Sequence, residues 1–131
     1  MAVTPHAMRL RVLKYSPKVS SEERIAAARL LLAAGQTTEA LDLFLLAGDE
    51  AAIREIEKLA VSGGHPHLLL SMRRYGRECD PATWKATGEA AAANGRWCEA
   101  YRAFSEAGDE AGLARVDEVL PGYAPFKPQG K

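Results

Sequence analysis

The sequence predicts an all-α fold made of antiparallel helical hairpins, and three observations favour it. Residues 35–50 return sixty positions later, as residues 95–110, with many positions unchanged. Aromatic residues make up only 7% of the chain, and Val, Ile and Thr are sparse beside abundant Ala, which favours helices over strands. Apolar residues also recur at helical spacing between glycine-marked breaks. A repeated period of this kind indicates stacked structural repeats.

The two copies share the positions that a packed hairpin requires. A glycine ends a helix at little steric cost, and a following acidic residue can cap the next one. A small residue lets two helices approach, and an aromatic ring fills the space between them. The shared residues are Gly35 and Gly95, Glu39 and Glu99, Ala40 and Ala100, Phe44 and Phe104, and the runs Ala47-Gly48-Asp49-Glu50 and Ala107-Gly108-Asp109-Glu110.

Residues 1–20 form a basic amino-terminal segment without a single acidic residue. Its basic residues are Arg9, Arg11, Lys14 and Lys18. Residues 6–15 favour a short helix with Met8, Val12 and Tyr15 on its apolar face, although the alternation of basic and apolar residues also suits a strand. Pro17 ends this element, because the residue before a proline is disfavoured in the helical conformation.

The first hairpin follows this segment. Ser20 is placed to cap a helix, and Glu23, three residues later, can return a hydrogen bond to the amide of the cap. Thr37 is expected to cap the second helix, which ends at Gly48. The short connection from Gly48 to Asp49 makes the helices on either side neighbours.

The middle of the chain predicts two more helices, separated by Gly63-Gly64. The apolar face of the first is expected to consist of Ala52, Ile53, Ile56, Leu59 and Ala60. Pro66 suits the first position of the second helix, which Gly76 ends. Its apolar face is expected to consist of Leu68, Leu69, Met72 and Tyr75.

Three helices close the series, over residues 81–94, 97–107 and 110–120. Asp80 and Pro81 open the first of them, as an acidic cap and a proline in the first turn. Residues 121–131 contain proline and lack periodicity, so this tail is expected to be extended or disordered. The helical-repeat domain therefore covers residues 21–120.

From Trp84 onward the sequence resembles the tetratricopeptide repeat, whose pattern is Trp-x-x-Leu-Gly-x-x-Tyr followed by Ala-x-x-x-Phe. The residues that match at this spacing are Trp84, Gly88, Gly95, Ala100, Phe104 and Ala107. Thr87 and Ala91 stand in place of the family's Leu and Tyr. The earlier copy keeps Gly35, Ala40, Phe44 and Ala47, with Arg24 and Ala28 in place of Trp and Gly.

The resemblance implies hairpins stacked as a short right-handed α-solenoid. On its frame the units lie near residues 21–48, 49–80 and 81–108, and residues 109–120 form a capping helix. In peptide-binding members of the family, side chains of the first helices line the inner groove. The corresponding positions here include Arg29, Lys85 and Glu89. The asparagines of the family's carboxylate clamp are absent at these places, so a carboxylate clamp is not expected.

Charge gives little indication of the partner. Seventeen basic and seventeen acidic residues cancel, so no overall field attracts nucleic acid or an anionic membrane. Besides residues 1–20, basic residues concentrate at Arg73, Arg74 and Arg77. A solvated helix face explains such a run, and the alternatives are a docking patch for an acidic protein or for an RNA backbone.

Candidates for chemistry are few. His65 and His67 lie near Cys79 in sequence, but the chain has neither a Cys-x-x-Cys nor a His-x-x-x-His spacing, and a structural zinc site needs four convergent ligands. We therefore expect no metal, no cofactor and no catalytic site, since phosphate-loop, nucleophile-elbow and dinucleotide patterns are absent as well. Cys79 and Cys98 are expected to be free thiols.

The sequence leads to the expectation of a non-catalytic scaffold that binds a protein or peptide. The alternative is an RNA-associated helical-repeat protein that uses the basic residues. No apolar run is long enough to cross a membrane, and the amino-terminal residues lack a signal-peptide pattern, so we expect a cytoplasmic protein without membrane contact. Tyr123 and Phe126 in the tail suggest a weak homodimer.

Overall fold

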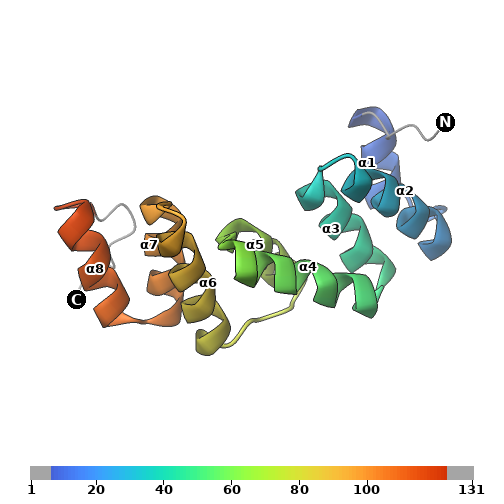
Figure 1. The fold of residues 1–131 in the computed structure, drawn as a ribbon. Helices are drawn as coiled ribbons and strands as arrows, with labels where there is room; N and C mark the ends of the chain where they lie inside the picture. Colours follow the sequence, from blue (N-terminus) through green and yellow to red (C-terminus); the bar gives the residue numbers. More distant parts are fainter. Residues whose placement is uncertain (1–6, 124–131) are drawn as a thin grey trace. The chain divides into compact units, whose positions relative to one another are not determined.

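The computed structural model describes residues 7–123, and within them every regular element is a helix (Figure 1). Eight helices follow one another without a strand in this range. Their bounds are α1 Ala7–Tyr15, α2 Ser21–Ala33, α3 Thr37–Ala47, α4 Glu50–Gly63, α5 Pro66–Arg74, α6 Pro81–Ala93, α7 Trp97–Ala107 and α8 Glu110–Val119. The all-α prediction is confirmed.

The chain divides into two compact units. Unit 1 comprises residues 1–58 and 68–78, and unit 2 comprises residues 59–67 and 79–131. Helices α4 and α5 each contribute residues to both units. In unit 1, α2 packs against α3 and α1 contacts both; in unit 2, α6 packs against α7 and α8 contacts both. Each unit is therefore built around one repeated hairpin.

The hairpins α2–α3 and α6–α7 close in the same way. In the first, Gln36 N donates to Leu31 O at 2.9 Å, and in the second Arg96 N donates to Ala91 O, also at 2.9 Å. Gly35 and Gly95 occupy the residue before these donors. The bonds satisfy carbonyls that a helix end leaves without a partner.

The helix caps follow the sequence closely, with one exception. Ser20 and Glu23 form the predicted capping box, and Asp80 accepts a bond from Thr83 N. The prediction for Thr37 is wrong: Gln36 is the cap residue, it makes no side-chain cap bond, and Thr37 is already helical. The backbone hydrogen bond from Gln36 N to Leu31 O closes this short turn, and α3 begins at the next residue.

The second connection in each unit uses glycine and aspartate as predicted. Gly48 and Gly108 have φ of 75° and 68°, the left-handed conformation that glycine adopts without a Cβ clash. Asp49 then accepts a bond from Ala52 N at 3.3 Å, and Asp109 accepts one from Gly112 N at 3.1 Å. These bonds start α4 and α8 in the same manner.

Most of the repeat positions are buried as the pattern requires. Ala40, Ala100 and Phe104 are fully buried, Phe44 is 1% exposed and Trp84 3%, and Gly88 is buried as well. Ala47 and Ala107 at the helix ends are half-buried. In unit 2 the Phe104 ring lies so close to two helix backbones that a Cβ on Gly88 or Gly112 would meet it at 2.6 or 2.5 Å.

Helix α1 settles the choice between helix and strand, but its buried face differs from the prediction. Val12 and Tyr15 are 44% and 76% exposed, whereas Leu13 is buried. Arg24 holds the end of this helix: its Nε donates to Leu13 O at 2.7 Å, and the other guanidinium nitrogens reach Ser16 O and Val19 O. Arg24 therefore binds α1 where the other copy has Trp84.

An ion pair adds to the attachment of α1. Lys14 Nζ lies 3.0 Å from Oδ2 of Asp42, a buried residue of α3. Burial acts to lower the pKa of Lys14, but the hydrogen bond and charge of Asp42 outweigh it and raise that pKa. The pair therefore favours the charged form of Lys14.

Two residues expected on the apolar faces of the middle two helices are also exposed. Leu59 is 49% exposed and Tyr75 38%. Ile53, Ile56 and Ala60 define the buried face of α4, and Leu59 lies at its edge; Tyr75 lies one residue beyond the end of α5. Within residues 7–123, no helix has the length and apolar character needed to span a membrane. The predicted tail lies largely outside the described residues, as does Phe126.

Candidate functional site

The predicted partner-binding residues of unit 1 lie on exposed or half-exposed positions. The Arg29 side chain is 69% exposed, with Nη2 3.8 Å from Oδ2 of Asp49. Arg74 donates to the Ser71 hydroxyl at 2.9 Å, and Arg77 forms an ion pair with Glu50. Arg73 is half-buried. Part of the basic run is thus bound to acceptors of the same unit.

The predicted residues of unit 2 both belong to α6. Lys85 is exposed. One turn later, Glu89 accepts a bond from Arg115 Nη1 of α8 at 2.6 Å, with both side chains 45% exposed. Glu89 therefore connects α6 to α8, the helix that follows the second hairpin. In unit 1, Arg29 of α2 similarly approaches Asp49, the residue before α4.

The same helix position carries opposite charges in the two copies. Arg29 of α2 corresponds to Glu89 of α6 at the period of sixty residues, and Ile25 corresponds to Lys85. The glycines of the turns, Gly35 and Gly95, and the buried pairs Ala40/Ala100 and Phe44/Phe104 agree between the copies. The exposed surface of the first helices therefore differs in charge between the two hairpins.

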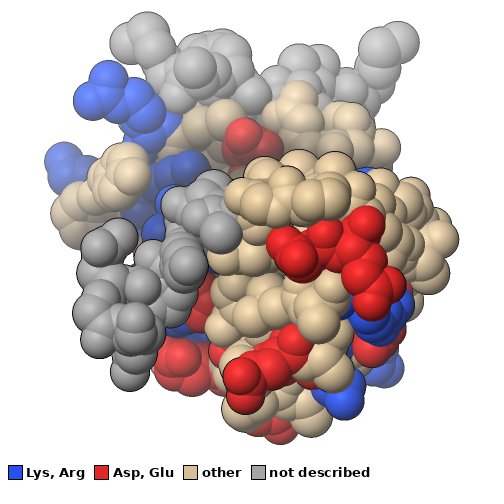
Figure 2. Space-filling view, turned by 90° about the vertical axis from the view of Figure 1, so that its left-hand side faces the viewer, with Lys and Arg blue, Asp and Glu red and all other residues tan. Residues whose placement is uncertain are grey.

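Acidic side chains gather on α8. Figure 2 views the molecule from the side on which α8 lies and shows red acidic groups over a largely uncharged surface. The exposed acidic residues of this helix are Glu110, Asp117 and Glu118. Nearby, a hollow of about 490 Å³ is lined by residues of α7 and α8 that include Tyr101, Arg102, Glu106 and Leu113.

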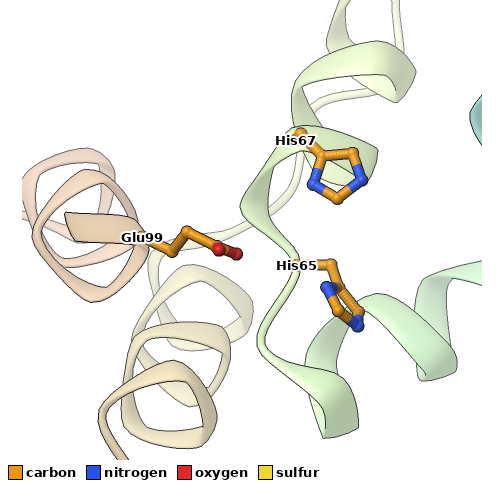
Figure 3. Close-up of side chains that lie close together, drawn as sticks. All are labelled: His65, His67 and Glu99. Atoms are coloured by element: carbon orange, nitrogen blue, oxygen red, sulfur yellow. The ribbon is translucent and has the colours of Figure 1, made fainter. Parts of the chain in front are cut away.

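A histidine cluster in unit 2 is the other concentration of chemically versatile groups. His65 precedes α5, His67 lies in its first turn, and Glu99 lies in the first turn of α7. Figure 3 shows the Glu99 carboxylate directed toward the two imidazoles. One ligand atom from each residue lies within 4.8 Å of the others, and the two rings stand edge-to-face with centroids 5.7 Å apart.

Arg96 holds this cluster together. Its Nη1 donates to His65 Nδ1 at 3.1 Å and approaches Glu99 Oε2 at 3.4 Å, while Nη2 donates to the Gly63 carbonyl. Because a guanidinium can only donate, His65 Nδ1 accepts and the neutral ring carries its proton on Nε2. Burial, and then the charge of Arg96, lowers the pKa of His65.

The sequence pointed to the histidines but not to their neighbours. Cys79 does not belong to the group, and Glu99 comes from a helix more than thirty residues away. The only signal for Glu99 was its repetition of Glu39, which indicated a structural role. Only the fold brings α7 beside the chain at His65.

Tyr123 contacts its own chain. Its ring meets that of Tyr101 edge-to-face, with centroids 5.2 Å apart, and it packs on the cluster that contains Phe104 and Val116. Cys79 and Cys98 are free thiols.

Comparison with protein-family models, with curated proteins and with solved structures gives no match to this chain.

Proposed function

We propose that the chain is a non-catalytic scaffold, a tetratricopeptide-like helical repeat that binds a protein or peptide through the exposed side chains of α2 and α6. The observation that carries the proposal is the contrast within the repeat. The turn glycines and the buried Ala and Phe of the second helix are kept between the copies, while Arg29 and Glu89 exchange charge at one exposed position. Binding specificity resides in such differing residues, because the shared ones are used for packing.

The proposed arrangement stacks the hairpins into a short right-handed solenoid. A single hairpin cannot bury both of its faces, so stacking of neighbours supplies the remaining core. Small-angle scattering measures this directly: a solenoid gives an elongated particle whose scattering profile is independent of protein concentration. A profile that fits only separately tumbling units contradicts the stacked arrangement without bearing on the individual hairpins.

The binding surface can be tested by photo-crosslinking in extract of the native cells. A crosslinking amino acid replaces Arg29 or Lys85 in the full-length chain, and captured proteins are identified by mass spectrometry. We expect both positions to capture the same partner. The matched control places the crosslinker at Arg54, an exposed residue of α4, and should not capture it. Equal capture from all three positions contradicts the assigned surface.

Charge reversal gives an independent test. Arg29→Glu and Lys85→Glu are expected to reduce capture of that partner, whereas Arg54→Glu leaves it unchanged. The rival nucleic-acid function predicts retention on RNA at low salt that falls steeply as salt rises. The binding of Arg77 to Glu50 and of Arg74 to Ser71 favours the protein partner, because these cations already have acceptors within unit 1.

A further inference from the structure

The cluster at the start of α5 contains the donor set of a transition-metal site. Two imidazoles and a carboxylate come from different segments of unit 2, and their ligand atoms face one another (Figure 3). His67 is exposed, and the Glu99 side chain is 39% exposed. Solvent and ions therefore reach the cluster directly.

The ring of His65 is oriented by its surroundings. A Cβ built on Gly63 would lie 2.7 Å from Cδ2 and Nε2 of this ring, so that edge is covered by the end of α4. The opposite nitrogen, Nδ1, faces the Arg96 guanidinium. Nδ1 is therefore the atom that His65 presents to the centre of the cluster.

A cationic group already contacts two of the three residues, His65 and Glu99. The Arg96 guanidinium touches His65 Nδ1, Glu99 Oε2 and the Gly63 carbonyl. The arrangement shows that the cluster accommodates positive charge. It also means that any metal ion must displace Nη1 of Arg96 from His65.

We propose that His65, His67 and Glu99 form a binding site for a zinc-like divalent transition-metal ion, with Arg96 as the competing internal cation. Zinc binds imidazole nitrogen and carboxylate oxygen at about 2.0–2.2 Å, and a site with three protein ligands leaves a fourth position for water or a partner's ligand. Tetrahedral donors at this bond length lie about 3.4 Å apart. Side-chain rotation of His67 and Glu99 brings the donors from within 4.8 Å to that spacing.

The donor types select the class of ion. Imidazole suits zinc, copper and nickel, whereas calcium and magnesium prefer sites built from oxygen alone. Two nitrogens and one carboxylate group therefore favour the former ions. The site differs from the structural sites that four ligands close, since it is open on the solvent side.

The proposal is tested by titrating the untagged full-length chain with ZnCl₂ in an isothermal calorimeter. We expect one ion to bind per chain. His67→Gln and Glu99→Gln are each expected to weaken binding by more than the factor of about 10 to 100 that loss of an outer-shell partner costs. The matched control is Glu39→Gln, which removes the equivalent carboxylate of the first copy and should leave zinc affinity unchanged.

Two further measurements separate this site from other zinc ligands of the chain. Substitution with Co²⁺ should give absorption of four-coordinate cobalt without a thiolate charge-transfer band, which excludes Cys79 and Cys98 as ligands. Arg96→Gln should bind zinc several-fold more tightly, because the competing cation is gone. Circular dichroism confirms that each variant retains the helical fold.

The results that overturn the proposal are specific. Absence of saturable zinc binding by the wild-type chain contradicts the site outright. Equal affinity of the wild-type, Glu39→Gln and Glu99→Gln chains shows that zinc binds elsewhere. If Arg96→Gln binds no more tightly than the wild type, Arg96 is not the competing cation.

Discussion

The hairpins α2–α3 and α6–α7 share their turns but fill their interiors differently. Both close with a 2.9 Å backbone bond and both end in a left-handed glycine followed by a capping aspartate. Around the phenylalanine, however, the first copy has Ala28 and Ala52 where the second has Gly88 and Gly112. The comparison teaches that turn geometry is kept residue by residue, whereas the core changes through compensating residues.

A second difference lies where the copies meet other elements. Trp84 is buried in unit 2, and the equivalent Arg24 binds the carbonyl oxygens of Leu13 in α1 and of Ser16 and Val19 after it in unit 1. A buried aromatic ring and a half-buried guanidinium thus occupy one repeat position. The element that packs against each hairpin determines which of these two residue types is suitable at this position.

The largest expected effect comes from removing the central ring of each copy. Phe104→Ala should lower the free energy of unfolding by about 3–5 kcal/mol, since the ring is fully buried. Phe44→Ala should lower the free energy of unfolding by less. The first copy has Ala28 and Ala52 at the positions of Gly88 and Gly112, and their methyl groups supply side-chain atoms that the second copy lacks. Urea unfolding of both variants measures the difference. A loss below about 1 kcal/mol for Phe104→Ala contradicts its role in the core.

A smaller effect tests the exchange of alanine for glycine. Gly88→Ala places a Cβ 2.6 Å from the Phe104 ring, and Gly112 prevents the ring from moving aside. Overpacking costs about 1–3 kcal/mol and outweighs the helix propensity of about 1 kcal/mol gained over glycine. Denaturant unfolding should therefore show net destabilisation.

The double variant isolates the cause of that effect. In a Phe104→Ala background the clash is absent, so Gly88→Ala should stabilise the chain by the propensity difference alone. The change of sign between the two backgrounds is the expected result of this double-mutant cycle. Stabilisation by Gly88→Ala in the wild-type chain means that the ring does not require glycine.

The smallest effect distinguishes the amino-terminal caps of α2 and α6. The hydrogen bond from the Thr83 hydroxyl, and then that from Thr83 N, lowers the pKa of Asp80 below its ordinary value of 3.8. This carboxylate therefore stabilises the fold above pH 3.8, and the contribution is lost as pH falls through the depressed pKa. Ser20, the equivalent cap of α2, does not titrate in this range.

Hydrogen exchange measures this difference locally. Protection of the first-turn amides of α6 should decrease as the pH falls below 3.8, after correction for intrinsic exchange, while that of the α2 amides changes less. Asp80→Ser, which copies Ser20, should remove the difference. If the protection of the α6 amides does not change with pH in either the wild-type chain or Asp80→Ser, Asp80 does not stabilise the start of α6 in a pH-dependent way.

Local signals allowed much of the fold to be predicted. The Ser20–Glu23 box, Asp80 with Pro81, and Gly48 with Asp49 lie within a few residues of the bonds that they form. Helix α7 was predicted at its observed bounds because a break and a glycine cap enclose it. Short-range hydrogen bonding of this kind is encoded in sequence without knowledge of the tertiary structure.

The remaining features depend on contacts between distant residues. Arg24 reaches the end of α1, and Leu13 rather than Val12 is buried, because α2 and α3 determine which face of α1 is covered. Glu99 and Arg96 approach His65 only through the packing of unit 2. The spacing of residues within one helix does not indicate contacts between distant segments, so the candidate metal site could be found only from the structure.

The identical runs at residues 47–50 and 107–110 also bear on how such a chain changes length. Deletion of residues 51–110 would remove sixty residues and leave one Ala-Gly-Asp-Glu run intact at the junction. In a shortened product α8 follows α3 through the same glycine turn and aspartate cap that now lead from α3 into α4. The sixty-residue segment from α4 to α7 is thus bounded by the same glycine turn and aspartate cap at both ends.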